Sequence, residues 1–337
     1  DGLLTRVSTS GGHQMEYVYD DKFRIMYTIE HIKGGRYKTA YSYDEASRVS
    51  AISYPSGFCV EKKYSNTGYE MMVCDAKTQT VLWKTDKTNS AGYITEYQVG
   101  NGLKTQYSYN PYDFMVEKIV TKRGDEVLQS LDYRYDGMCN MISRSDHVDY
   151  NCEVFEYDSY ERLTKIILNS EVNGLMTYFD NGNIQSKEMN GEKVLYNATY
   201  AVNKPNAIIS AKSDNEKMFE RFNQNIVYSS FDNVIAIEDE NSSLLMDYGY
   251  DNERVFMQCI SGDKIKKKVY AGNCEYIEED GVTKILTYLD GPMGVFAVCV
   301  KNEGNDTSET INYIHKDNIG YNYLKLYKYL FYLNIFC

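Results

Sequence analysis

The stretch Tyr41-Ser42-Tyr43-Asp44-Glu45-Ala46-Ser47-Arg48-Val49-Ser50-Ala51-Ile52 decides the fold. Its two tyrosines are separated by one residue, so both rings point to the same face of an extended strand. Asp44 follows them and can accept hydrogen bonds from the backbone amides of a turn. From Val49 onward the side chains alternate between two faces, as they do in a strand. The stretch therefore predicts a β-hairpin.

The phrase Tyr-x-Tyr-Asp, or a close variant, recurs along the chain. Its copies are Tyr17-Val18-Tyr19-Asp20, Tyr41-Ser42-Tyr43-Asp44, Tyr133-Arg134-Tyr135-Asp136, Phe155-Glu156-Tyr157-Asp158 and Tyr248-Gly249-Tyr250-Asp251. The spacing supports a repeat, because Tyr19 and Tyr43 are 24 residues apart and Tyr135 and Tyr157 are 22 residues apart. A unit of this length holds two strands of about seven residues and two turns.

We therefore predict an all-β fold, an array of β-hairpin repeats that forms a curved, spiralling sheet. Tyrosine makes up 34 of the 337 residues, so phenol rings supply much of the apolar area while their hydroxyls need hydrogen-bond partners. The chain has only 4 prolines, which leaves long stretches free to pair as strands. Gly291-Pro292-Met293-Gly294 is expected to form a hairpin turn. The polar, weakly helical run from Ala211 to Phe222 is expected to be a loop or short insertion.

The charge balance argues against nucleic acid as a partner. The formal net charge is −12 and the pI is about 5.0, whereas affinity for nucleic acid depends largely on basic side chains that neutralise phosphates. The densest basic run, Lys264–Lys268, is interpreted as the solvated face of a strand. Charged residues (25%) and hydrophobic residues (43%) lie in the ordinary range of globular proteins, so disorder is not expected.

No metal or cofactor site is expected. The 8 cysteines include no CxxC pair. The histidines are far apart in the sequence, at His13, His31, His147 and His315. Disulfides across hairpins stay open for Cys139 with Cys152 and for Cys259 with Cys274, although packed thiols are favoured because a chain of this length needs no covalent staples. The single tryptophan, Trp83, receives no functional assignment.

The repeats resemble the YD repeats of rearrangement-hotspot (RHS) proteins, which read roughly Tyr-x-Tyr-Asp-x-x-Gly, then Arg or Asn, then Leu or Ile. The phrases that carry the resemblance are Tyr41–Val49, Tyr157–Leu163 and Asp180–Ile184. The segment Tyr313-Ile314-His315-Lys316-Asp317-Asn318-Ile319-Gly320 is similar to the opening of the RHS repeat-associated core signature. The resemblance covers about residues 15–320.

The resemblance gives a structural role to the residues of the repeat signature, and no catalytic, cofactor-binding or metal-binding role to any of them. These residues are Tyr17, Tyr19, Asp20, Tyr41, Tyr43, Asp44, Arg48, Tyr133, Tyr135, Asp136, Tyr157, Asp158, Arg162, Asp180, Gly182, Asn183, Tyr248, Tyr250, Asp251, Arg254, Tyr313, His315, Asp317 and Gly320.

Three segments are expected from the same comparison. Residues 1–310 form the YD-repeat array, residues 311–320 begin the RHS-associated core signature, and residues 321–337 form an atypical hydrophobic tail, which we interpret as a truncation. A docked strand or helix and a membrane anchor are the alternatives for the tail. Lys325 and Lys328 interrupt it, and its 17 residues are fewer than the ~20 apolar residues of a membrane-spanning helix. The sequence contains no Asp-Pro pair, so the autoproteolytic residues of self-cleaving RHS proteins are not carried over.

The family resemblance implies a hollow β-shell, as in insecticidal toxin complexes, bacterial polymorphic toxins and the YD shell of teneurins. We therefore expect a structural encapsulation module that is not an enzyme, secreted or associated with a bacterial cell surface. Its expected partners are the upstream part of the same RHS chain and a C-terminal effector.

Two other functions are weighed against the shell. A surface-exposed carbohydrate- or cell-binding module is the first alternative, because tyrosine is favoured in adaptable interfaces. The second is a hydrolase that uses His315 and Asp317, which would share one face of a strand. We expect these two side chains to form hydrogen bonds in a turn instead.

Overall fold

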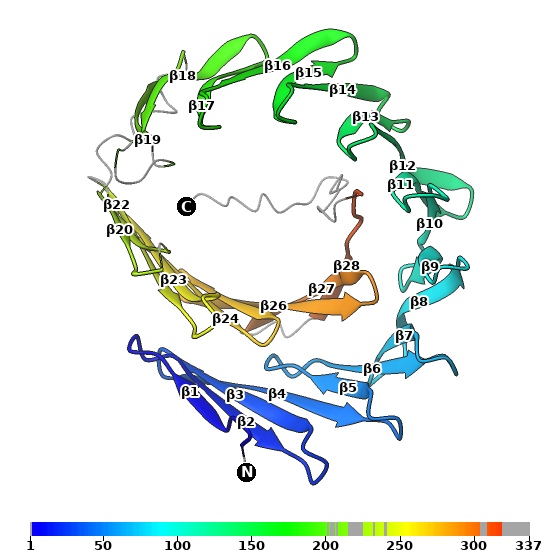
Figure 1. Ribbon diagram of the computed structural model, residues 1–337. Helices are drawn as coiled ribbons and strands as arrows, with labels where there is room; N and C mark the ends of the chain where they lie inside the picture. The colour runs from blue at the N-terminus through cyan, green and yellow to red at the C-terminus, as the bar shows by residue number, and fades with distance from the viewer. Residues whose placement is uncertain are drawn as a thin grey trace. The chain divides into compact units, whose positions relative to one another are not determined.

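The computed structural model describes residues 2–200, 202, 206, 208–214, 225–231, 233–238, 241–303 and 309–318. Within these ranges the chain forms β-strands and no helix (Figure 1). The all-β prediction is therefore confirmed, with sequential antiparallel hairpins as the building unit. The predicted hydrophobic tail, residues 321–337, lies outside the described residues, and so does Gly320.

The chain divides into two compact units. The first unit comprises Asp1–Thr88, Tyr97–Gly102 and Gln224–Cys337, and the second comprises Asn89–Glu96 and Leu103–Asn223. The first unit thus combines residues from the early and late parts of the sequence, and most of the second unit comes from the part between them.

The beginning of the chain supplies the first sheet of the first unit. Each of its strands pairs antiparallel with the next one along the chain. The strands are β1 (Arg6–Ser8), β2 (Gln14–Tyr19), β3 (Ile25–Ile32), β4 (Gly35–Tyr43), β5 (Val49–Ser53), β6 (Cys59–Tyr64), β7 (Glu70–Asp75) and β8 (Val81–Thr88). The next strand, β9 (Ile94–Val99), contributes residues to both units.

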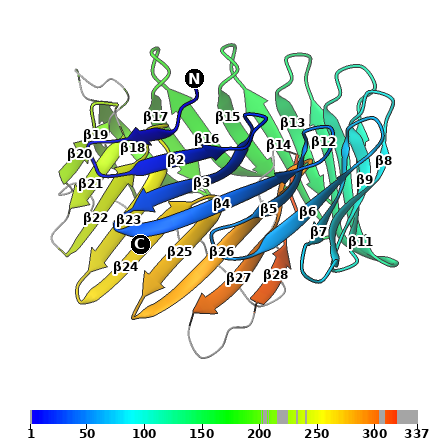
Figure 2. The same ribbon diagram turned by 90° about the horizontal axis from the view of Figure 1, so that it is seen from below.

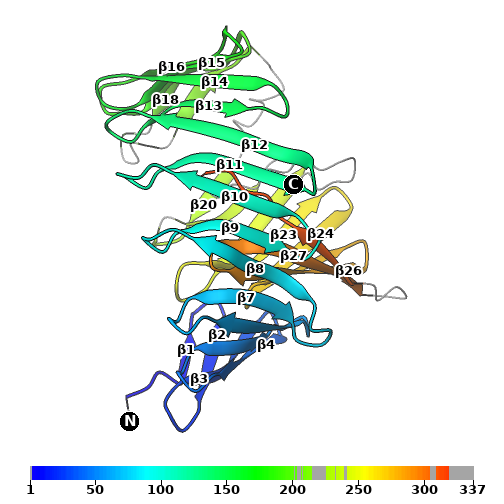
Figure 3. The same ribbon diagram turned by 90° about the vertical axis from the view of Figure 1, so that its right-hand side faces the viewer.

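The second unit consists of hairpins in unbroken succession, which Figure 3 shows one after another. Their strands also pair antiparallel with the next in sequence. They are β10 (Lys104–Tyr109), β11 (Val116–Arg123), β12 (Glu126–Tyr135), β13 (Met141–Asp146), β14 (Asn151–Tyr157), β15 (Leu163–Leu168), β16 (Glu171–Tyr178), β17 (Ile184–Met189), β18 (Glu192–Tyr200) and β19 (Ile208–Lys212). The expectation of a loop from Ala211 onward was wrong for its first two residues, because Ala211 and Lys212 belong to β19 and extend the ladder.

The end of the chain forms the second sheet of the first unit, again by sequential antiparallel pairing. Its strands are β20 (Asn225–Tyr228), β21 (Val234–Glu238), β22 (Ser242–Tyr248), β23 (Arg254–Ser261), β24 (Lys264–Ala271), β25 (Cys274–Glu279), β26 (Val282–Gly291), β27 (Gly294–Glu303) and β28 (Glu309–Tyr313). The turn predicted at Gly291–Gly294 connects β26 to β27, as expected.

The basic run Lys264–Lys268 lies on β24, as predicted, but it is solvated only in part, because Lys264 is exposed whereas Lys268 is half-buried. Acidic residues of the neighbouring strand β25 oppose it. The closest ion pair joins Lys268 Nζ to Glu275 Oε1 at 2.8 Å, and Lys266 Nζ pairs with Glu279 Oε2 at 3.0 Å. These cross-strand pairs neutralise the run locally.

The two sheets of the first unit pack against each other, and Figure 2 shows the strands β2–β6 lying over β23–β26. One cluster between them contains Ile32, Val255, Phe256 and Ala271. Further along the same contact, the Thr287 hydroxyl donates to Ser56 Oγ at 2.7 Å. A face that a single sheet would leave in water is thereby buried, and this burial stabilises the unit.

Trp83, which received no assignment from sequence, is a central residue of this packing. It is 1% exposed, its ring is stacked on Tyr97 at a centroid distance of 3.8 Å, and Phe296 of the opposite sheet lies at 5.5 Å. Its Nε1–H donates to Thr85 Oγ1 at 3.2 Å, so the polar atom of the buried indole has a partner.

The seven described cysteines are all free thiols. Cys259 and Cys274 cannot face each other across a hairpin, because β24 lies between their strands. Cys152 opposes Ser145 on β13, while Cys139 lies in the preceding turn. Both of the disulfides left open by the sequence are therefore absent from this structure.

Candidate functional site in the repeat turns

Aspartates of the repeat phrase cap the turns that connect one hairpin to the next. In the turn after β14, Asp158 Oδ1 accepts hydrogen bonds from the backbone N–H groups of Tyr160 at 2.9 Å and Arg162 at 3.0 Å. The Asp158 N–H in turn donates to the Arg162 carbonyl at 3.0 Å. The carboxylate thus satisfies donors that the turn leaves unpaired, which explains why an acidic residue follows the second tyrosine. The same capping geometry occurs at Asp20, Asp44 and Asp136.

The second carboxylate oxygen binds the basic residue four positions later. Asp158 Oδ2 receives Nε of Arg162 at 2.8 Å and Nη2 at 2.7 Å, which is a bidentate pair. The Arg162 hydrogen bond is the main cause that lowers the pKa of Asp158. At Asp44 the main cause of a lowered pKa is the hydrogen bond from the Arg48 backbone. Both carboxylates are therefore held in the ionised form.

Seven of the tyrosines that precede a turn fasten their own strand to the strand before it. Tyr178, the last residue of β16, donates its hydroxyl hydrogen to the carbonyl of Leu163, the first residue of β15, at 2.7 Å. Burial raises the pKa of Tyr178, which keeps the hydroxyl protonated and able to donate. Equivalent bonds run from Tyr43 to Ile25, Tyr64 to Val49, Tyr109 to Ile94, Tyr157 to Met141, Tyr200 to Ile184 and Tyr248 to Val234.

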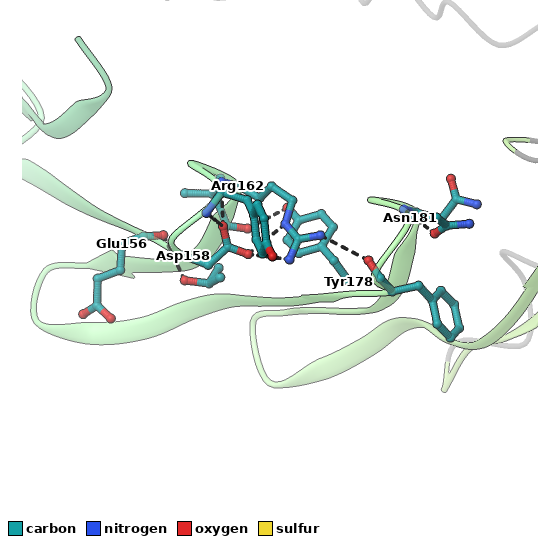
Figure 4. Close-up of polar contacts among 10 residues, drawn as sticks. Glu156, Asp158, Arg162, Tyr178 and Asn181 are labelled. Atoms are coloured by element: carbon teal, nitrogen blue, oxygen red, sulfur yellow. Dashed lines mark hydrogen bonds and ion pairs between the residues drawn. The ribbon is translucent and has the colours of Figure 1, made fainter. Parts of the chain in front are cut away.

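Arginine then connects one turn to the following repeat. The Nη1 of Arg162 donates to the Phe179 carbonyl at 3.1 Å, and its guanidinium lies 4.7 Å from the centroid of the Tyr178 ring. Figure 4 shows Arg162 between Asp158 and the turn that begins after Tyr178. Arg48 repeats the arrangement over Tyr64 at 4.5 Å. Tyrosine, aspartate and arginine thus form a chain of contacts from repeat to repeat, with positive charge over an aromatic face.

The phrase at Tyr248–Arg254 is used in a different register from the one that the sequence suggested. The turn begins at Gly249, whose N–H donates to the Glu253 carbonyl at 2.8 Å, and Tyr248 makes the hydroxyl bond to the preceding strand. Tyr250 and Asp251 are therefore turn residues and not the strand-end tyrosine and its capping aspartate. The distance from aspartate to arginine in the sequence indicates this shift. Asp251 precedes Arg254 by three residues, whereas Asp44 and Asp158 precede their arginines by four.

A similar shift applies to Asp180-Asn181-Gly182-Asn183. Here the turn begins at Phe179, whose N–H donates to the Asn183 carbonyl at 2.8 Å, so Asp180 is an exposed turn residue and not the cap. Gly182 adopts a positive φ of 89°, a conformation that glycine accepts without strain.

The first tyrosines of the phrases lie apart from the turns. Tyr133 is buried at 3% exposure, and burial raises the pKa of Tyr41. The hydroxyl of Tyr17 lies 2.6 Å from that of Tyr250 across the two sheets of the first unit. Tyr135, the second tyrosine of the phrase that begins at Tyr133, ends β12 ahead of Asp136.

Several turns are capped by residues outside the phrase Tyr-x-Tyr-Asp. In these turns a tyrosine or another strand-end residue precedes serine or asparagine, whose side-chain oxygen accepts the backbone N–H groups in the place of aspartate. The capping residues are Ser65, Asn89, Asn110 and Ser229. The pairs Tyr64-Ser65, Tyr109-Asn110 and Tyr228-Ser229 were visible in the sequence as a tyrosine followed by a small polar residue.

The predicted core phrase lies at the end of the described chain. Tyr313 ends β28, and its hydroxyl lies so close to Gly100 that a Cβ at that position would overlap with it. His315 and Asp317 come after the strand, so they do not share a strand face as the hydrolase alternative required. Asp317 is buried at 8% exposure.

Metal ligands do not gather anywhere in the described ranges, where no three His, Cys, Asp or Glu side chains are placed to hold an ion. The same residues include no helix that is long and apolar enough to cross a membrane.

Comparison with known proteins gives a match at the level of structure. Neither protein-family models nor curated protein sequences match the chain. The crystal structure of TcdB2-TccC3-TEV superposes with a TM-score of 0.74 and 15% sequence identity over 94% of this chain and 19% of that chain. The crystal structure of TcdB2-TccC3-Cdc42 gives a TM-score of 0.76 and 14% identity over 92% of this chain and 19% of that chain.

The structure of a Photorhabdus luminescens Tc holotoxin pore with a TccC3 mutation is also similar, with a TM-score of 0.74 and 15% identity over 92% of this chain and 19% of that chain. The chain therefore spans about one fifth of the length of the solved chains that it matches. The predicted resemblance is confirmed for the fold: the chain has the all-β fold of the RHS/YD-repeat shell in the TcdB2-TccC3 Tc toxin structures.

Proposed function

We propose that the chain is a segment of a shell wall, a structural encapsulation module without catalytic activity in an RHS-type toxin or cell-surface protein. The observation that supports this most strongly is the chain of tyrosine, aspartate and arginine contacts. It fastens the ends of neighbouring hairpins where an arginine follows the cap, for example from Asp158 through Arg162 to Tyr178.

The hairpins of the second unit belong to one sheet, and their stability has a physical explanation. The described strands β14, β15 and β16 each share backbone hydrogen bonds with two neighbours, so none of these three is an edge strand. Such repeats contact mainly their neighbours, and their stability grows by the interface that each unit adds. Turn contacts that bridge adjacent repeats strengthen that interface without a thick hydrophobic core.

The segments and partners follow from the same proposal. Residues 1–310 act as the repeat array, and residues 311–320 begin the core signature, while residues 321–337 form an atypical tail. The partners are the upstream part of the same RHS chain and a C-terminal effector enclosed by the shell. The structural signature consists of the residues named from the sequence, with the register shifts described above. The location is outside the cell or at its surface.

Protease protection in the intact protein tests this function. A cleavage site for a specific protease is placed C-terminal to the core signature, and a second protein carries the same site on an exposed N-terminal tag. We expect the internal site to resist cleavage until the shell is denatured, while the tag is cut at once. Equal cleavage of both sites, or electron-microscopy images of a particle without an internal space, would contradict a shell.

A recognition surface is the second candidate, and one observation favours it. Aromatic side chains stand fully exposed at turn tips, with Tyr112 at 91% and Tyr160 at 78% exposure, each two residues after its capping residue. Exposed tyrosines are typical of adaptable binding surfaces. Binding to a glycan array that disappears in the double variant Tyr112→Ala and Tyr160→Ala would support this candidate, and an array without any bound glycan would remove it.

A further inference from the structure

His13 is a buried histidine whose ring nitrogens have no hydrogen-bond partner. It closes the turn before β2, where the Thr9 N–H donates to the His13 carbonyl at 2.9 Å, and it is 5% exposed. Both Nδ1 and Nε2 are buried without a partner. A buried polar group in this state is costly and calls for an explanation.

The nearest ionisable group is Glu30 of β3, which is also buried. Its Oε2 lies 3.8 Å from His13 Nε2, and its Oε1 accepts the backbone N–H of Gly272 at 3.0 Å. Gly272 belongs to the turn between β24 and β25, so Glu30 connects the first sheet of the unit to the second. A Cβ at Gly272 would overlap with Thr39 Oγ1, so the two sheets approach closely at this point.

The second sheet also reaches the other side of the His13 ring. Tyr250 stacks on it with centroids 6.3 Å apart, and Gly249 lies against its Cε1 edge. The ionisable groups around the pair are Tyr17 of β2, Tyr41 of β4, Tyr250 and Asp251 of the turn after β22, and Cys274 of β25. Asp251 is the acidic side chain among them, and its charge acts on both His13 and Glu30.

Burial acts on the two groups in opposite directions. It raises the pKa of Glu30 from 4.5 to about 7 and lowers the pKa of His13 below 6.5. Each group is thus pushed toward its neutral form, because a buried charge without a full set of partners is unfavourable. The ordinary pKa values have the opposite order, 4.5 for Glu30 and 6.5 for His13, so in water the same pair would carry its proton on the imidazole.

We propose that His13 and Glu30 form a one-proton latch that holds the first hairpins against the turns of the second sheet. The closed contact keeps one proton on the pair, and the latch weakens when the pair holds no proton or two. With no proton, the buried Glu30 carries a negative charge near Asp251. With two protons, the buried imidazolium carries a positive charge that the neutral Glu30 carboxyl does not balance.

The latch predicts a specific dependence on pH. At a pH below 6.5 and above the lowered pKa of His13, the closed pair holds one proton on Glu30 and the open pair holds one on His13, so opening neither binds nor releases a proton. The raised pKa of Glu30 alone would favour opening as the pH rises from 4.5 to about 7. The lowered pKa of His13 alone would favour opening as the pH falls below 6.5. The two effects cancel in the wild-type chain.

Single substitutions remove this cancellation and give the test. Hydrogen exchange of the Gly272 amide is followed in the full chain between pH 5 and 6.5 and corrected for its intrinsic dependence on pH. We expect a flat opening equilibrium in the wild type above the lowered pKa of His13, a rise of up to about tenfold per pH unit in His13→Gln, and a fall of up to about tenfold per pH unit in Glu30→Gln. The glutamine at position 30 keeps an oxygen to accept the Gly272 N–H.

Two controls keep the test decisive. His147→Gln changes an exposed histidine that pairs with Asp132 at 2.6 Å, and the exchange of the Gly272 amide should stay flat in that variant. The double variant His13→Gln and Glu30→Gln should also be flat. Equal slopes in the wild type and both single variants would overturn the latch. If a variant fails to fold, NMR titration of the wild-type His13 ring decides instead: a midpoint at or above pH 6.5 would overturn it.

Discussion

The guanidinium of Arg162 lies 4.7 Å from the centroid of the Tyr178 ring, although the two residues belong to consecutive repeats. The same arginine holds the capping carboxylate of its own turn, Asp158, and the carbonyl of the next turn. One side chain therefore belongs to both repeats. Strand pairing sets the distance between consecutive turns of the sheet. An arginine four residues after a capping residue can therefore reach the next turn, as Arg48 does as well.

Removal of one tyrosine hydroxyl should weaken the ladder locally. Tyr178→Phe keeps the ring but loses the bond to the Leu163 carbonyl, and we expect a loss of about 1 kcal/mol in the free energy of unfolding. Tyr160→Phe is the matched control, because that ring is 78% exposed and the substitution should change stability by less than about 0.5 kcal/mol. Denaturant titration of both variants measures the difference. Equal stability of the two would mean that the buried hydroxyl contributes nothing.

The planar guanidinium should matter more than the charge at position 162. Arg162→Lys keeps the positive charge but loses the bidentate bond to Asp158 and the flat contact with Tyr178, and we expect a loss of about 1 kcal/mol. Arg134→Lys, at an exposed position on β12, should be neutral within about 0.5 kcal/mol. The unfolding midpoints of the two variants are compared. An unchanged midpoint in Arg162→Lys would mean that the positive charge alone stabilises the contact.

The third position after the cap carries strain that glycine would relieve. Glu161 has a φ of 61°, a left-handed conformation that costs a residue with a Cβ about 1 kcal/mol. We expect Glu161→Gly to raise the free energy of unfolding by up to about 1 kcal/mol, whereas Ser159→Gly, in the same turn but without positive φ, should lower it. Thermal unfolding distinguishes the outcomes, and destabilisation by both glycines would show that the strain at position 161 is negligible.

The hairpins could be predicted from the sequence because their signals are local. Alternation and the capping aspartate act within a single hairpin, and the repeat spacing of 22 to 24 residues connects neighbouring units, so strands such as β4 and β5 are defined correctly. Register within a degenerate phrase is harder to predict. At Tyr248–Arg254 two tyrosines compete for the place at the end of the strand, and only the spacing to the arginine separates the two choices.

The packing inside the first unit could not be predicted in this way. Glu30 and Gly272 are 242 residues apart, and no periodic pattern connects them. His13 was noted only as a histidine far from the others, because its burial depends on a sheet formed at the opposite end of the chain. Trp83 is a similar case, since Phe296 covers it from the second sheet.

Acid should weaken the turns through the capping aspartates. The pKa of Asp158 in the folded chain is below its ordinary value of 3.8, chiefly because of the Arg162 hydrogen bond, so its contribution to stability is complete above pH 3.8 and is lost as the pH falls through the folded pKa. Asp158→Asn should therefore reduce the loss of stability below pH 4, whereas Ser159→Ala, in the same turn, should keep the acid dependence of the wild type. Unfolding midpoints from pH 2.5 to 5 measure it, and identical acid profiles for Asp158→Asn and the wild type would contradict the prediction.

Truncation of Trp83 should destabilise the first unit and leave the stability of the second unit unchanged. The indole is 1% exposed and lies between Tyr97 and Phe296, so Trp83→Ala leaves a large cavity between the sheets and should cost about 3–5 kcal/mol, while Trp83→Phe keeps an aromatic ring and should cost less. Hydrogen exchange locates the effect. Amides of β26 and β27 should exchange faster because they belong to the packed sheet, and amides of β14–β16 in the second unit should keep their protection. Equal loss of protection in both regions would mean that the chain unfolds as one cooperative block, since the damage at Trp83 would then have spread along the ladder of hairpins.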